Sequence, residues 1–110
     1  MLKGYTKENL DLELKKNGRT LALFYASWCP YCRGFVSVFD EKAVNLGFEQ
    51  VIHVLLDDYD NPLWDDYNVV AVPTVIAFDE GKVYNRLDGR LGRGLPVNQF
   101  LSWIEEIKKT

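Results

Sequence analysis

The chain of 110 residues contains two cysteines, Cys29 and Cys32, which lie close together in "ASWCPYCRGF", residues 26–35. Two thiols at this spacing can form and break a disulfide with each other, or can supply part of a metal site. A disulfide between them closes a very short loop and removes little entropy from the unfolded chain, so it is a weak structural cross-link. In a reducing compartment such a pair is more typical of redox catalysis or metal binding.

The metal interpretation requires more ligands than this pair supplies. A structural zinc ion takes a full tetrahedral set, and the single histidine of the chain, His53, is the only further soft ligand. We therefore expect no metal site and no bound cofactor in one chain. A metal or cluster shared between two chains remains as an alternative from another functional class.

The surrounding pattern predicts the elements that position the pair. A first helix is expected over about 7–17, with Thr6 as its cap and Gly18 at its end. The apolar run "TLALFYA", residues 20–26, predicts a buried strand. A helix from Pro30 or Tyr31 to about 45 follows, with apolar residues at helical spacing. The cysteines thus lie where a strand ends and a helix begins.

The rest of the chain continues the alternation. Strands are expected over 48–56, 72–78 and 83–87, and helices over 63–67 and about 96–109. The turn "DEGK", residues 79–82, predicts an antiparallel hairpin, and residues 88–94 form a glycine-rich loop. Strands that alternate with helices predict parallel pairing before this hairpin. We expect one α/β domain over residues 1–110, with a central mixed sheet of about four strands flanked by helices.

A helix start has free backbone N–H groups and the positive end of the helix dipole, which both favour a thiolate. We expect Cys29 to cap this helix and to act as the nucleophile that forms a mixed disulfide. Cys32 falls about one turn inside the helix, where it should be less exposed. It would then resolve the mixed disulfide by attacking Cys29.

The segment "FYASWCPYCR", residues 24–33, resembles the active-site stretch of thioredoxins, with Trp28 before the cysteine pair and Arg33 after it. "VVAVPTVIAF", residues 69–78, is similar to their cis-proline segment, and Gly89 to a late glycine on the substrate side. The resemblance covers nearly the whole chain. It implies a thioredoxin fold and a dithiol–disulfide oxidoreductase that needs no cofactor.

The resemblance also implies that the Val72–Pro73 peptide bond is cis and packs against Cys29. The backbone of Val72 would pair with an extended substrate peptide. Thr74, which would follow it into the strand, would also contact the substrate, together with Gly89 and Arg90. Thioredoxins usually carry a buried acid at the position that is Leu23 here. The proton step at Cys32 would then need water or another group, such as His53 or Asp57.

The dipeptide Pro30-Tyr31 resembles that of glutaredoxins. This supports an alternative in which the protein acts on glutathione mixed disulfides, with Arg90 holding an acidic partner or a glutathione carboxylate. Against it, "GRLGRGLPVNQF", residues 89–100, lacks the Gly-Gly-x-x-Asp stretch by which glutaredoxins hold glutathione.

Composition limits the partners. The net charge of −3 argues against a nucleic-acid ligand, which favours a basic surface. No apolar run is long enough to span a bilayer, and the N-terminal residues lack the apolar segment of a secretory signal. We expect a cytoplasmic monomer whose substrates are protein disulfides and which a reductase or glutathione recycles.

Overall fold

A computed structural model describes residues 7–16 and 18–108. Along the chain the elements are α1 (Lys7–Lys16), β1 (Arg19–Tyr25), α2 (Cys32–Ala43), β2 (Gln50–Leu55), α3 (Leu63–Asp66), β3 (Thr74–Asp79), β4 (Lys82–Leu87) and α4 (Val97–Ile107). The order of helices and strands agrees with the sequence prediction, and most bounds agree within two residues. The expected cap Thr6 and the expected helix ends at residues 17 and 109 lie outside the described residues.

The four strands form one mixed sheet in the order β2-β1-β3-β4. β1 and β2 are parallel, with Leu23 opposite His53, and helix α2 makes the crossover between them. β3 and β4 form the expected antiparallel hairpin. β1 lies inside the sheet and is almost entirely buried because its run of Leu, Ala, Phe and Tyr offers apolar side chains to both faces.

The direction of β3 departs from the parallel pairing that alternating strands and helices suggested. β3 runs antiparallel to β1, and Thr74 lies opposite Phe24 near the end of β1. The reason is geometric, since α3 has only four residues and the connection from β2 stays at one end of the sheet. The chain therefore re-enters the sheet beside the end of β1 and has to run back.

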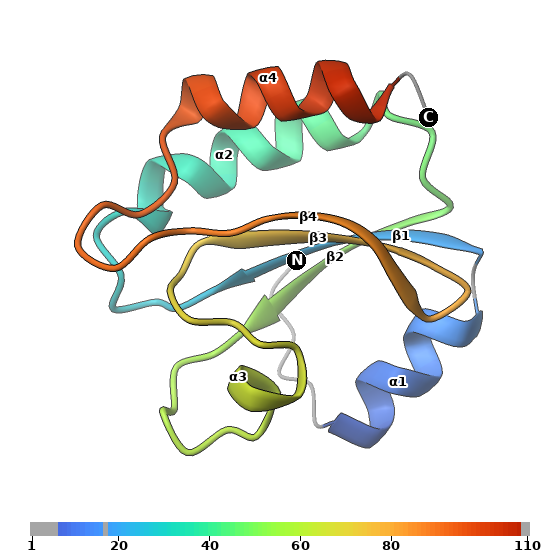
Figure 1. The fold of residues 1–110 in the computed structure, drawn as a ribbon, viewed down its shortest axis with the longest axis horizontal. Helices are drawn as coiled ribbons and strands as arrows, with labels where there is room; N and C mark the ends of the chain where they lie inside the picture. Colours follow the sequence, from blue (N-terminus) through green and yellow to red (C-terminus); the bar gives the residue numbers. More distant parts are fainter. Residues whose placement is uncertain (1–6, 17, 109–110) are drawn as a thin grey trace.

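Helices cover both faces of the sheet, with α2 and α4 on one side and α1 and α3 on the other (Figure 1). Helix α2 buries Cys32, Phe35, Phe39 and Ala43, which share one face at helical spacing. In α4, Phe100, Trp103, Ile104 and Ile107 are buried, whereas Val97 and Leu101 are exposed. The buried face of α2 holds its first residue, Cys32, against the end of β1.

Candidate active site

Cys29 lies in the turn between β1 and α2, and the helix begins at Cys32. The Cys29 N–H donates to the Ala26 carbonyl, and the Cys32 N–H donates to the Cys29 carbonyl, each at 3.2 Å. This differs from the expectation that Cys29 caps a helix starting at Pro30. The backbone of Cys29 closes a turn over Pro30 and Tyr31, and α2 carries no side-chain capping bond at its first residue.

The sulfur of Cys29 instead faces the segment before β3. Its thiol donates to the Val72 carbonyl oxygen, with Sγ and oxygen 3.6 Å apart. The Val72–Pro73 peptide bond is cis, as the resemblance implies. Two segments that are distant in sequence thus meet at the nucleophile that we expected.

Exposure does not separate the two cysteines in the way we expected. Both residues are 2% exposed, because the start of α2 packs tightly against β1 and the segment before β3. They differ in what lies beside them. Cys29 lines a surface cavity of about 150 Å³, and Cys32 does not. A substrate can therefore approach Cys29 from the cavity, whereas Cys32 lies behind it.

Cys32 is held in its protonated form. Burial raises the pKa of its thiol to about 12, and a hydrogen bond with Cys29 acts in the same direction. A thiol with so high a pKa contributes little thiolate at neutral pH, and only the thiolate is an effective nucleophile. Cys32 is therefore suited to a second step in which its proton is removed.

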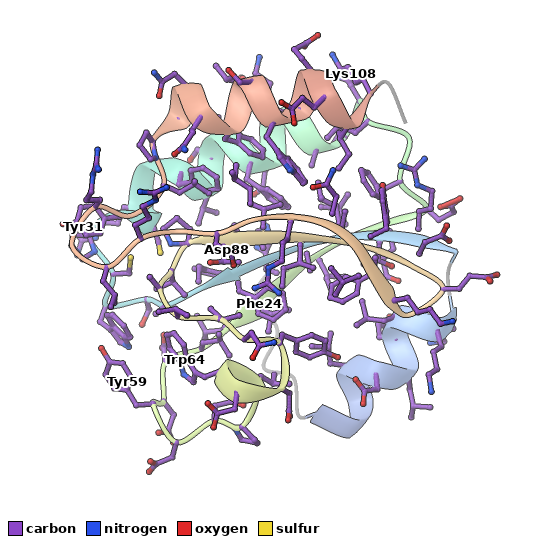
Figure 2. The ribbon with its side chains drawn as sticks, viewed as in Figure 1. Phe24, Tyr31, Tyr59, Trp64, Asp88 and Lys108 are labelled. Atoms are coloured by element: carbon purple, nitrogen blue, oxygen red, sulfur yellow. The ribbon has the colours of Figure 1, made fainter. Side chains whose placement is uncertain are left out.

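Aromatic side chains form one wall of the cavity. The rings of Trp28 and Tyr59 lie 5.1 Å apart between centroids, and those of Tyr59 and Trp64 stack at 5.7 Å. In Figure 2, Tyr31, Tyr59 and Trp64 lie toward the same end of the sheet. Val70, Ala71 and Val72 line the cavity between this wall and Cys29. The cavity thus offers an apolar surface beside a thiol.

Asp57 joins this wall to the cysteine turn. Its carboxylate accepts hydrogen bonds from the Ser27 N–H at 2.6 Å and from the Ser27 hydroxyl at 2.7 Å. Its carbonyl accepts a bond from the Trp28 indole N–H at 2.9 Å. Asp57 was considered as a proton acceptor for Cys32; in the structure its carboxylate bonds to Ser27, and its backbone carbonyl holds Trp28 in place.

The opposite wall comes from the glycine-rich loop. The Tyr31 hydroxyl donates to the Gly92 carbonyl at 2.8 Å, and Arg90 and Leu91 line the cavity beside it. Gly94 also lies close to Tyr31, since a Cβ at Gly94 would come within 2.5 Å of the Tyr31 side chain. Tyr31 of the cysteine motif is therefore a packing partner of this loop, and Arg90 reaches the cavity as expected.

Thr74 and Gly89 do not line the cavity, although both were expected to bind substrate. Both are buried, because they pack together beneath the cavity and the Gly89 N–H donates to the Thr74 hydroxyl at 3.1 Å. That hydroxyl donates to the Ala71 carbonyl at 2.7 Å. These contacts place the 71–73 segment relative to the loop that begins at Gly89. The two residues thus position Val72 and Arg90.

The buried acid is absent, as the sequence indicated. Leu23 is fully buried on the sheet face that α2 covers, and its parallel neighbour in β2 is His53. His53 is buried too, and its Nε2 lies 2.6 Å from Asp40 Oδ1 on α2. His53 therefore has its own acidic partner on this face.

Several residues of the cavity could not be foreseen. Five residues that line it were not among the candidates from the sequence: Tyr59, Trp64, Val70, Leu91 and Gly92. The available signal was the aromatic-rich segment that follows β2. Strand β2 is parallel to β1, so the two strands end at the same edge of the sheet. Arg33 is exposed on α2 and does not line the cavity. Across residues 7–16 and 18–108, no group of three or more potential metal-ligating side chains is placed to hold a metal ion.

A mixed sheet that presents a Cys-x-x-Cys pair against a cis-proline segment is typical of proteins that carry a redox-active dithiol. The sequence pattern of the Thioredoxin family matches residues 2–105. The chain therefore belongs to the thioredoxin family.

Individual relatives agree with this assignment. Thioredoxin Y, chloroplastic, from Oryza sativa subsp. japonica is 32% identical over 105 residues, which cover 94% of this chain and 60% of that protein. A thioredoxin of Mycoplasmoides gallisepticum is 33% identical over 94 residues, which cover 86% of this chain and 89% of that protein. The solved structure of Plasmodium falciparum thioredoxin has a TM-score of 0.72 at 19% identity, and the match covers 96% of this chain and 98% of that one. This last likeness concerns the fold.

Proposed function

We propose that the protein is a dithiol–disulfide oxidoreductase that reduces protein disulfides through Cys29 and Cys32. The observation that carries the proposal is the placement of the pair. Cys29 lines an apolar cavity, and Cys32 lies behind it with its thiol pKa raised to about 12 by burial. This arrangement separates a first, accessible thiol from a second, protected one.

The reaction follows from this order. The Cys29 thiolate attacks one sulfur of the substrate disulfide, and the other substrate sulfur leaves with the electron pair of the broken bond. Cys32 then loses its proton and attacks Cys29 Sγ. A Cys29–Cys32 disulfide forms, the bond to the substrate breaks, and the second substrate sulfur leaves and takes up a proton. The substrate gains two electrons, and the protein is oxidised.

The walls of the cavity support a polypeptide substrate. An exposed aromatic surface beside the nucleophile matches the composition of protein-binding sites, which are rich in Trp and Tyr. We propose that the Val72 backbone pairs with the substrate chain while its side chains contact Trp28 and Tyr59. Pro30 would complete the floor beside Cys29.

Recycling requires an electron donor, and we propose a reductase or glutathione acting on the Cys29–Cys32 disulfide of a monomeric domain. The pair would work in a reducing compartment such as the cytoplasm, where disulfides do not persist. None of the helices described over 7–16 and 18–108 is long and apolar enough to cross a membrane.

The test is reduction of a protein disulfide with dithiothreitol as the electron source. Wild type should accelerate the reaction, whereas Cys29→Ser should be inactive, since the first attack requires this thiol. An active Cys29→Ser protein would contradict the proposal. A glutathione mixed disulfide assayed in parallel tests the glutaredoxin-like alternative, which the Pro30-Tyr31 dipeptide favours.

A further inference from the structure

Tyr25 is a buried polar residue that the mechanism above does not use. It ends β1, is 5% exposed, and its hydroxyl has no hydrogen-bond partner among the residues that the structure describes. A buried hydroxyl without a partner destabilises a folded protein, because it loses its bonds to water. Such a group therefore calls for a functional explanation.

The position of Tyr25 connects it to Cys32. Tyr25 and Leu23 are two residues apart on β1, so their side chains share one face of the sheet. Tyr25 packs on His53, which bonds to Asp40 of α2, so this is the face that α2 covers. The next residue, Ala26, makes a backbone hydrogen bond with the Cys32 thiol. The phenol of Tyr25 is thus two residues along β1 from Leu23, which stands where thioredoxins usually carry the acid. It is also adjacent in sequence to Ala26, which contacts Cys32.

The charged and titratable groups around Tyr25 come from each element packed against it. His53 on β2 contacts its ring edge-on, with centroids 5.7 Å apart. Burial raises the pKa of Tyr25, and Asp57 after β2, Asp40 on α2 and Cys32 itself add to this shift. The phenol therefore keeps its proton through the neutral range and can donate a hydrogen bond there.

We propose that the Tyr25 hydroxyl stabilises the Cys32 thiolate in the resolving step, by donating a hydrogen bond through one bridging water. This inference rests on the proposed function. It gives the resolving step a neutral donor in place of a carboxylate that accepts a proton. The proton that Cys32 releases goes to the departing substrate sulfur by way of solvent, so Tyr25 ends the step unchanged.

The test uses an aromatic disulfide that releases a coloured thiolate, Ellman's reagent, mixed with excess reduced protein. Attack by Cys29 releases a first thiolate, and resolution by Cys32 releases a second, so one trace reports both steps. Tyr25→Phe should leave the first phase unchanged and slow the second about tenfold, which corresponds to about one unit in the Cys32 pKa. In the same variant, the pH needed to reach a given second-phase rate should rise by about one unit.

Stability separates this role from a structural one. Tyr25→Phe removes an unpaired buried hydroxyl at constant shape, so the variant should fold and be at least as stable as wild type. Tyr67→Phe is the matched control. Its hydroxyl donates to Asp11, and its ring packs on Phe24, which points to the opposite face of the sheet. Tyr67→Phe should therefore leave both phases unchanged.

The outcomes are distinct. A second phase in Tyr25→Phe that equals wild type in rate at every pH tested would overturn the role of Tyr25, and so would equal slowing of both phases. Loss of the first phase in wild type would instead contradict the proposed function, because no disulfide would have been attacked.

Discussion

The Cys29 thiol donates to the Val72 carbonyl oxygen across 43 residues of sequence, with 3.6 Å between sulfur and oxygen. This contact joins the turn that ends β1 to the segment that begins β3. The nucleophile therefore lies directly beside the backbone that would hold the substrate. The residues around this contact can be tested by single substitutions.

Gly89 is the first such neighbour. A Cβ at this position would lie 2.3 Å from the Pro73 carbonyl oxygen, so Gly89→Ala must displace either the loop or the 72–73 segment. We expect a loss of about 1–3 kcal/mol in the free energy of unfolding and slower reduction of protein disulfides. Denaturant titration and the reduction assay measure the two effects.

Gly34 provides the contrast. It lies exposed in α2, and a Cβ there would meet nothing within 4 Å. Gly34→Ala should stabilise the protein by about 0.5–1 kcal/mol, because alanine favours a helix more than glycine does. Equal effects of the two substitutions would show that the close approach at Gly89 is unimportant.

Tyr59 tests the aromatic wall. Its side chain is 74% exposed, so its removal costs little folding energy, but the substrate loses a contact surface beside Trp28. Tyr59→Ala should weaken protein disulfide reduction about fivefold, as expected for about 1 kcal/mol of aromatic contact. Leu12→Ala, at a similarly exposed site on α1, is the control. An unchanged KM for a protein substrate in Tyr59→Ala would place docking elsewhere.

Asp57 tests the link between the wall and the cysteine turn. Asp57→Asn removes the charge that accepts the N–H and the hydroxyl of Ser27. We expect a loss of about 1.5–3 kcal/mol in unfolding free energy, since bonds to a charged group are the stronger kind. Asp60→Asn, at an exposed site in the same loop, should change stability by less than about 0.5 kcal/mol. Similar losses in both variants would point to a general charge effect.

The raised pKa of Cys32 predicts how the resolving step depends on pH. Below a pKa of about 12 the thiolate fraction of Cys32 grows about tenfold for each pH unit. The rate at which a mixed disulfide is resolved should therefore increase steadily with pH while the protein stays folded. Rapid-mixing measurements across the alkaline range test this. A rate that levels off near neutral pH would show that Cys32 ionises much more easily.

Parts of this site could be predicted because their signals are local. The Cys29–Cys32 pair, Trp28 and the Val-Pro-Thr segment are short motifs at strand ends, and alternating apolar runs indicate which strands lead to them. The missing acid at Leu23 was visible for the same reason.

Other parts depend on how distant segments meet. The stack of Tyr59 on Trp64 requires the path of the chain between β2 and β3, and the reversed direction of β3 depends on the same connection. Thr74 is a buried positioning residue because its hydroxyl bonds to Gly89, which follows the β3–β4 hairpin in the sequence. The burial of Cys29 likewise depends on its contact with Val72, which no local pattern shows.

The most direct measurement of the proposed mechanism is to identify the cysteine that carries the trapped substrate. Cys32→Ser protein, incubated with a disulfide-bonded protein substrate, should accumulate a stable mixed disulfide that peptide mass spectrometry locates at Cys29. Cys29→Ser should trap nothing, because Cys32 lies outside the cavity and stays protonated. A substrate trapped on Cys32 in the Cys29→Ser protein, at a rate similar to that on Cys29, would contradict the assignment of nucleophile and resolving thiol.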